Sequence, residues 1–161
     1  MKIQNLESIL VNNHNKYKNL ALDLFNLDIS SNSYPLTLAQ WESAIEKNIV
    51  YILANNNNIA GVCVWLDNSV IYEMELIQII ISKNYIGKGI ASAWLSYLCS
   101  AYKKFTLRLE VRKSNAAAQE VYAKCEFDVI GERKNYYPIY NHDKNEIIDR
   151  EHAVLMEKHI K

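Results

Sequence analysis

The sequence has no excess of charge of either sign. Its 161 residues carry 18 basic and 18 acidic side chains, so the formal net charge at pH 7 is +0. Such a chain has no overall field that would draw it to a nucleic acid or an anionic membrane. A charged ligand must therefore be held by a local group of residues. The length excludes two large domains, and because half of the residues are hydrophobic, we expect one domain spanning residues 1–161.

Long apolar runs are also missing. The longest, such as residues 76–81 with Gln78 inside, are far shorter than the roughly 20 residues that cross a bilayer. At the N-terminus, polar residues and Glu7 stand where a signal peptide would have its apolar region. We therefore expect a soluble, cytoplasmic protein.

Cysteine and arginine are scarce. The three cysteines are odd in number and lack the spacing of a metal site, which favours reduced, buried thiols. The four histidines form no cluster, so we expect no metal ion. Lysine outnumbers arginine fourteen to four, so each arginine is expected where a planar, bidentate group is needed. The arginines are Arg108, Arg112, Arg133 and Arg150, and the cysteines are Cys63, Cys99 and Cys125.

Hydrophobic periodicity predicts two helices and a hairpin in the first half of the chain. Apolar residues recur at helical spacing over residues 17–25, and Thr37 followed by Gln40 resembles a capping box that opens a second helix. The asparagine run at residues 55–58 separates two apolar segments, which favours a hairpin loop over a disordered linker. A long strand is then expected over residues 70–81.

The second half alternates between helices and strands. The spacing predicts helices over residues 87–102 and 115–124, with a strand over residues 105–111 between them. Further strands are expected at residues 127–133 and 150–156, joined by a polar loop. A meander followed by crossover units is typical of an α/β fold with a mixed, mostly antiparallel sheet flanked by helices.

The most informative segment is Gly87-Lys88-Gly89-Ile90-Ala91, where a buried strand gives way to an amphipathic helix. The small residues allow the backbone to approach a ligand closely, and unpaired amides of a first helical turn attract anions. This pattern predicts an anion pocket, most naturally for phosphate; a tight turn without a ligand is the alternative. The glycine spacing of Walker and Rossmann loops is absent.

This segment resembles the pyrophosphate-binding signature of the GNAT N-acetyltransferases, Gln/Arg-x-x-Gly-x-Gly/Ala, which binds acetyl-coenzyme A. Ile86 stands where the pattern has Gln or Arg, so a side-chain contribution is absent while the backbone amides remain. The resemblance implies the GNAT fold and an acetyl-CoA-dependent N-acetyltransferase. It further implies direct transfer in a ternary complex, with acetyl-CoA as cosubstrate and no metal.

A second block resembles the bacterial ribosomal-protein-alanine N-acetyltransferases, which acetylate the N-terminal alanine of a small-subunit ribosomal protein. It comprises residues 109–118, Tyr122 and Asn135-Tyr136-Tyr137-Pro138. The similarity is strong over residues 77–138; in the N-terminal third it rests on element order and on Tyr34-Pro35, which resembles an aromatic-Pro start to the second helix. The implied partner is a ribosomal protein N-terminus or another amine. We expect a monomer or weak dimer that binds neither nucleic acid nor membrane.

The resemblance implies a role for two side chains in proton transfer. Glu110 at the end of its strand resembles the proton acceptor, and Tyr122 resembles the general acid that protonates the thiolate leaving group. Without the resemblance, Glu110 would be interpreted as a surface partner of Arg108 or Arg112, and Tyr122 as a packing residue.

The remaining site residues are also implied by the resemblance. Residues expected to bind the coenzyme are Ile79, Ile80, Ile81, Gly87, Lys88, Gly89, Ile90, Ala91, Ser92 and Asn115. The three isoleucines would act through their backbone, and Asn115 is also a good helix N-cap. Tyr136 and Tyr137, in the polar loop, resemble the wall of the acceptor site.

Two other functions fit the sequence. One is a GNAT enzyme that acetylates a small amine such as a polyamine or an aminoglycoside, for which Glu73 and Glu75 would attract the cation. The other is a catalytically inactive binding module. Glu126 also departs from the family pattern, which has glycine there; a left-handed backbone at this position would cost about 1 kcal/mol.

Overall fold

The computed structural model describes residues 2–3, 6–11, 19–55, 58–141, 143 and 146–159. Its strands are β1 (Lys2–Ile3), β2 (Leu6–Leu10), β3 (Ile49–Asn55), β4 (Asn58–Asn68), β5 (Glu73–Ile81), β6 (Thr106–Arg112), β7 (Asp128–Tyr140) and β8 (Ile147–His159). Its α-helices are α1 (Leu20–Ser31), α2 (Leu38–Lys47), α3 (Ile90–Cys99) and α4 (Ala116–Lys124), with short 3₁₀ turns at Ser69–Ile71 and Lys83–Tyr85.

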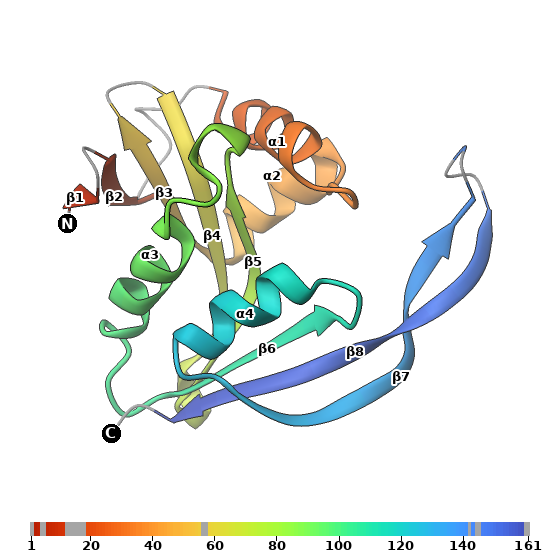
Figure 1. Ribbon diagram of the computed structural model, residues 1–161. Coiled ribbons are helices and arrows are strands. Elements are labelled where there is room, and N and C mark those ends of the chain that lie inside the picture. Colours follow the sequence, from red (N-terminus) through yellow and green to blue (C-terminus); the bar gives the residue numbers. More distant parts are fainter. Residues whose placement is uncertain are drawn as a thin grey trace.

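The strands form one sheet in the order β1-β2-β3-β4-β5-β6-β8-β7. Every neighbouring pair is antiparallel except β5 and β6, which run parallel because α3 crosses between them. Helices α1 and α2 cover one face of the sheet, and α3 and α4 cover the other (Figure 1). The prediction of an α/β fold with a mixed, mostly antiparallel sheet is thus confirmed.

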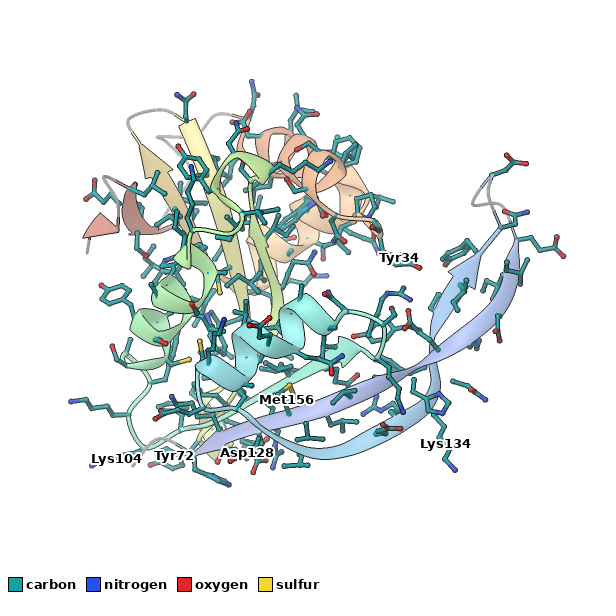
Figure 2. The ribbon with its side chains drawn as sticks, in the orientation of Figure 1. Tyr34, Tyr72, Lys104, Asp128, Lys134 and Met156 are labelled. Atoms are coloured by element: carbon teal, nitrogen blue, oxygen red, sulfur yellow. The ribbon has the colours of Figure 1, made fainter. Side chains whose placement is uncertain are left out.

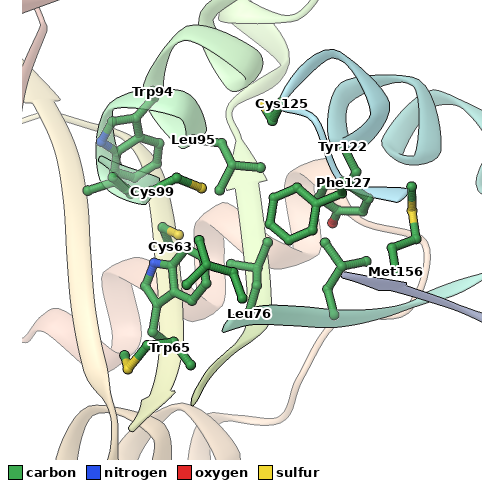
Figure 3. Close-up of a cluster of buried hydrophobic side chains, with 14 of the residues drawn as sticks. Cys63, Trp65, Leu76, Trp94, Leu95, Cys99, Tyr122, Cys125, Phe127 and Met156 are labelled. Carbon is green, nitrogen blue, oxygen red and sulfur yellow. The ribbon is translucent and has the colours of Figure 1, made fainter. Parts of the chain in front are cut away.

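A hydrophobic core lies on each face. Beneath α1 and α2 the core includes Leu24 and Trp41, and beneath α3 and α4 it includes Trp65 and Trp94, all fully buried. Figure 3 shows the second cluster. Helix α3 approaches β4 closely at Gly61, where an added Cβ would lie 2.8 Å from the carbonyl oxygen of Ile80 and 3.2 Å from the Trp94 ring. Glycine is therefore required there for space.

Several local predictions are confirmed. Thr37 and Gln40 form a complete capping box at the start of α2: the Gln40 amide donates to the Thr37 hydroxyl, and the Thr37 amide donates to the Gln40 side chain. Strands β3 and β4 pair as an antiparallel hairpin, although residues 56–57 of the predicted loop lie outside the described residues. The first helix begins at Leu20; residues 17–18 of its predicted range are also outside the described residues.

Two predicted element boundaries were wrong because residues with positive φ interrupt the periodic pattern. The strand expected from residue 70 begins at Glu73, since Tyr72 has φ of 56° at the end of a 3₁₀ turn. The helix expected over residues 87–102 spans Ile90–Cys99. Gly87 and Gly89, with φ of 77° and 71°, precede it and cannot continue a right-handed helix.

The largest correction concerns the C-terminal region. The polar loop expected between two short strands is instead strand structure, because β7 runs to Tyr140 and β8 starts at Ile147. Together they form a long curved hairpin, here called the arm, which extends beyond the rest of the sheet (Figure 1). Its polar side chains are exposed on both faces, so they lack the alternation that marks a half-buried strand.

Glu126, which follows α4, has φ of 65°, so this position does require a left-handed backbone, and its carboxylate pairs with Lys158 at 2.8 Å.

Within the described residues, no helix is both long enough and apolar enough to cross a membrane.

Candidate active site

The candidate site is centred on a gap between two parallel strands. Strands β5 and β6 pair only as far as Leu76 and Leu109. Beyond that point β5 continues to Ile81 paired only with β4, and β6 continues to Arg112 paired only with β8. The strands therefore diverge, and residues 77–81 and 110–112 carry strand edges that do not pair with each other; we call this divergence the wedge. Backbone groups on the inner edges of the wedge can bond an extended ligand as an added strand would.

At the open end of the wedge, the loop before α3 presents backbone amides. Gly87 and Gly89 both have left-handed φ values, and an added Cβ at either would meet no atom within 4 Å. Glycine is therefore favoured at these positions by the backbone angle and not by a lack of space. The amides of Gly87, Gly89, Ile90, Ala91 and Ser92 donate to no acceptor in the part of the chain that the structure describes. Amides at the positive end of a helix suit a phosphate group.

Neighbouring side chains in this loop bond locally. The Lys88 Nζ donates to the carbonyl oxygen of Asn84 at 2.9 Å, and the Ser92 hydroxyl donates to the carbonyl oxygen of Gly89 at 3.1 Å. Ile86, at the position that departs from the family pattern, is 60% exposed. The loop therefore offers its backbone rather than its side chains to an anion.

Glu110 lies on β6 immediately after the last pair with β5. Alternation along β6 directs Leu109 and Val111 into the core beneath α4, so Glu110 faces the opposite side of the sheet. Its carboxylate pairs with the Arg133 guanidinium at 2.8 Å, and its side chain is only 17% exposed. The alternative expectation, that Glu110 pairs with Arg108 or Arg112, was wrong, because the partner of Glu110 is Arg133. Those arginines pair instead with Glu73 and Glu157, and with Glu151.

A cavity of about 290 Å³ opens beside Glu110 on this face. Its charged lining residues are Glu73, Glu75, Arg108, Glu110 and Arg133. Burial raises the pKa of Glu75, and the neighbouring Glu110 carboxylate raises it further, while Arg133 and Arg108 oppose the shift. The cavity thus combines three carboxylates with two guanidinium groups, a set that favours a cationic ligand able to replace one guanidinium.

Tyr122 projects from α4 on the other face of the sheet. It is 8% exposed and packs edge-on against Phe127, with ring centroids 6.2 Å apart (Figure 3). Burial raises its pKa, and Cys63 and Tyr137 add to the shift, so the phenol stays protonated at neutral pH. Its hydroxyl donates no hydrogen bond to any residue that the structure describes. The two predicted proton-transfer residues therefore approach the wedge region from opposite faces.

Other predicted residues also lie around the wedge. The Asn115 side chain accepts a hydrogen bond from the Ala118 amide at 3.1 Å, which confirms it as the N-cap of α4. Tyr136 and Tyr137 stand on β7, with ring centroids 5.0 Å apart. The Tyr137 hydroxyl donates to the carbonyl oxygen of Glu110 at 3.2 Å, and burial raises its pKa to about 12. The arm therefore contacts the strand that carries Glu110.

Arg133 and Tyr34 are site residues that the sequence did not single out as such. Arg133 pairs with Glu110, and the Tyr34 ring lies 3.6 Å from the Arg112 guanidinium carbon. The scarcity of arginine was the signal available, because each of the four arginines does pair with a carboxylate or a carbonyl.

The cysteines are all buried and free. Burial raises the pKa of Cys99 to about 12 and also raises the pKa values of Cys63 and Cys125, so none is a thiolate near neutral pH. Among the described residues, His, Cys, Asp and Glu do not gather into a group of three that could hold a metal ion.

The fold and the site define a class of enzyme. The sequence profile of the Acetyltransferase (GNAT) family matches residues 16–127. The chain therefore belongs to the GNAT acetyltransferase family and is an N-acetyltransferase.

Individual relatives are similar over most of the chain. One is the [Ribosomal protein bS18]-alanine N-acetyltransferase of Escherichia coli K12, which is 32% identical over 114 residues, covering 69% of this chain and 71% of the relative. The crystal structure of the ribosomal-protein-S18-alanine N-acetyltransferase from Escherichia coli superposes with a TM-score of 0.79 at 25% identity, covering 97% of this chain and 94% of the other. A GNAT acetyltransferase from Elizabethkingia anophelis with acetyl-CoA bound has a TM-score of 0.73 at 16% identity, covering 98% and 100%.

Proposed function

We propose that this enzyme acetylates the α-amino group of a protein N-terminus, most specifically an N-terminal alanine of a ribosomal protein. One observation carries the proposal: the Glu110 carboxylate lies where β5 and β6 separate, and it already pairs with a cationic group, that of Arg133. A protonated amine is also a cation and can take that place. The acceptor named for the relative from Escherichia coli supports the choice of an alanine N-terminus.

The wedge is the proposed place for acetyl-CoA. The inner edge of β5 at Ile79, Ile80 and Ile81 would pair with the pantetheine arm, and Asn115 would contact the same arm. The amides of Gly87, Gly89, Ile90, Ala91 and Ser92 would hold the pyrophosphate, with Lys88 in the same loop. The left-handed backbone at the two glycines and the unpartnered amides fit a polyanion there. When bound, acetyl-CoA supplies the acetyl group as a thioester.

Glu110 is the proposed general base. An α-amino group has a pKa of about 8, against about 10.4 for lysine, so removing its proton at pH 7 costs only about 1.4 kcal/mol. The carboxylate would accept that proton directly or through one water as the amine attacks the thioester carbonyl. Its position at the edge of the wedge and its low exposure support this role.

Arg133 must leave Glu110 before the amine can bind. Its side chain is 51% exposed and its guanidinium lies 4.7 Å from the Tyr136 ring, so it has solvent and an aromatic face to move toward. Because the guanidinium is half exposed, water screens its side of the pair, and an incoming ammonium group can take its place beside the carboxylate. We infer that the acceptor ammonium group replaces the Arg133 guanidinium, and that this exchange makes the Glu110 carboxylate available as a base.

Tyr122 is the proposed general acid. A phenol, with an ordinary pKa of about 10, is protonated at neutral pH and can donate a hydrogen bond to the thiolate leaving group, whose pKa is about 8.5 by analogy with cysteine. Burial raises the pKa of Tyr122 and so opposes full release of its proton, which makes hydrogen bonding to the leaving sulfur its first contribution. The absence of thiolate character at Cys63, Cys99 and Cys125 supports direct transfer over an acetyl-enzyme intermediate.

A small polyamine is the second candidate acceptor. Glu75 favours it, since this residue adds a further carboxylate to the cavity beside Glu110.

A cytoplasmic location, a monomeric or weakly dimeric state and the single domain remain predictions from the sequence.

A thiol-release assay decides between acceptors. It compares peptides starting with Ala, Ser or Met, a lysine peptide blocked at its N-terminus, and spermidine, each with acetyl-CoA. We expect the highest kcat/KM for the alanine peptide and none for the same peptide already acetylated. A preference for the blocked lysine peptide or spermidine would overturn the proposal, and coenzyme binding without turnover of any amine would support a binding module.

A further inference from the structure

The Arg112 guanidinium joins three segments that are far apart in the sequence. Arg112 ends β6, and its guanidinium carbon lies 3.6 Å from the ring centroid of Tyr34 in the loop between α1 and α2. The same carbon lies 4.6 Å from the ring centroid of Tyr137 on β7. Figure 2 labels Tyr34 where the helical layer faces the arm. The contacts therefore link the helical layer to the arm through one side chain at the end of the wedge.

Hydrogen bonds hold the guanidinium between the two rings. Its Nη1 donates to the Glu151 carboxylate at 2.7 Å and to the carbonyl oxygen of Pro138 at 3.2 Å. The other oxygen of Glu151 accepts from the Ser114 amide at 3.1 Å, and the side chains of Arg112 and Glu151 are only 14% and 13% exposed. A planar guanidinium can stack on aromatic faces while its N–H groups bond in plane, which a lysine ammonium cannot do.

Further hydrogen bonds hold the loop that carries Tyr34 and the hydroxyl group of Tyr137. The loop that carries Tyr34 is held by the buried carboxylate of Asp28, which accepts from the Leu36 amide at 2.8 Å and from the Trp41 indole at 3.0 Å. On the other side, the Tyr137 hydroxyl donates to the carbonyl oxygen of Glu110. The stack thus ends at the residue proposed as the base.

We propose that Arg112 is a positioning residue that fixes the wall of the acceptor cleft by clamping Tyr34 and Tyr137 beside Glu110. This inference rests on the proposed function, because it takes Glu110 as the place where the amine is bound. Losing the guanidinium frees the loop before α2 and the arm to move independently, and an acceptor then binds a less ordered wall. Most of the proposed coenzyme contacts are backbone groups of β5 and the α3 loop, which do not touch this clamp. The remaining one, Asn115, is held by its own bond to the Ala118 amide, so we expect coenzyme binding to survive the loss of the guanidinium.

The test compares Arg112→Met with Lys113→Met, a neighbouring exposed residue that loses the same charge. For Arg112→Met we expect the acceptor KM to rise about tenfold, with kcat changed less than threefold and the acetyl-CoA Kd unchanged within twofold. Arg112→Lys should resemble Arg112→Met, because charge without the planar fork does not restore the stack. Lys113→Met should behave as the wild type.

Variants of Tyr34 give a second test that does not disturb β6. Tyr34→Phe keeps the ring and should retain the wild-type KM, whereas Tyr34→Leu should raise the KM as Arg112→Met does. The double variant Arg112→Met/Tyr34→Leu should show no further rise, because both changes break one contact.

The outcomes separate this inference from the proposed function. An unchanged acceptor KM in both Arg112→Met and Tyr34→Leu, or additive effects in the double variant, overturns the clamp. If the wild type prefers a small amine over peptides, the proposed acceptor is wrong, and the clamp is then tested with that amine. Should Arg112→Met fail to fold, Tyr34→Leu and Tyr34→Phe decide the matter alone, because Tyr34 lies on a loop and is 40% exposed.

Discussion

The two sides of the wedge present different chemical groups to a ligand: backbone amides on one side and charged or aromatic side chains on the other. On the side of α3, the loop around Gly87 and Gly89 offers backbone amides whose direction depends on left-handed φ angles. On the other side, Glu110, Arg133 and Arg112 depend on ion pairs and ring stacking with distant strands and loops. A ligand site made of backbone depends on a few adjacent residues, whereas one made of side chains depends on how the whole sheet is assembled.

Among the side chains of the site, we expect the largest effect from changing Glu110, the proposed base. Glu110→Gln keeps the shape but loses proton affinity and the charge that pairs with Arg133, so kcat/KM should fall about 10²- to 10⁴-fold. Calorimetry should show the acetyl-CoA Kd unchanged within twofold. Glu132→Gln, the same change at an exposed residue beside Arg133 on β7, is the control and should retain full activity. A rate for Glu110→Gln within threefold of the wild type would remove Glu110 from the mechanism.

The role of the backbone amides in the loop before α3 is tested by Gly89→Ala. An alanine strains the left-handed φ of 71° by about 1–2 kcal/mol, so the free loop relaxes and coenzyme binding must restore its shape. We expect the acetyl-CoA Kd to rise about tenfold, with the acceptor KM unchanged at saturating coenzyme. The matched control is Gly131→Ala, where φ is not positive and an added Cβ meets no atom within 4 Å. Equal Kd values for both variants would contradict a role for the loop conformation.

A smaller effect, in the opposite direction, is expected at Arg133. Arg133→Gln removes the cation that competes with the acceptor for Glu110, so the acceptor KM should fall about two- to fivefold, because the half-exposed guanidinium is partly screened by water. Lys134→Gln, the exposed neighbour, should leave the KM unchanged. A higher KM in Arg133→Gln would mean that the guanidinium helps to bind the acceptor, and the idea of cation exchange would be wrong.

The same contrast explains which features could be predicted from the sequence. The capping box at Thr37, the N-cap at Asn115 and the turn at Gly87 and Gly89 that leads into α3 are local, and each was recognised from a few neighbouring residues. Anion binding by that turn stays a prediction. At Glu126 the signal was the family resemblance, which has glycine there and so pointed to a possible left-handed backbone; the observed φ is 65°. Boundaries failed where a positive φ interrupted a regular pattern, as at Tyr72.

The arm and the contacts around the base could not be obtained in this way. The first half of β7 was predicted, but its continuation over residues 134–140 was taken for a polar loop. Most side chains of β7 are exposed and its hydrophobicity does not alternate, so its pairing with β8 supplies the order. The partner of Glu110 was predicted among residues close in sequence, yet it is Arg133 from another strand.

The sequence alone determined the α/β class, the helices and strands with clear periodicity, the glycine-containing turn before α3 and the residue types available for acyl transfer. These depend on neighbouring residues and on the spacing of apolar side chains. Only the tertiary structure decided where β5 and β6 separate, which arginine covers the base, and that Tyr34, Arg112 and Tyr137 stack together. Those contacts join segments up to about a hundred residues apart, and no local pattern specifies them, because they form only when the sheet brings the segments together.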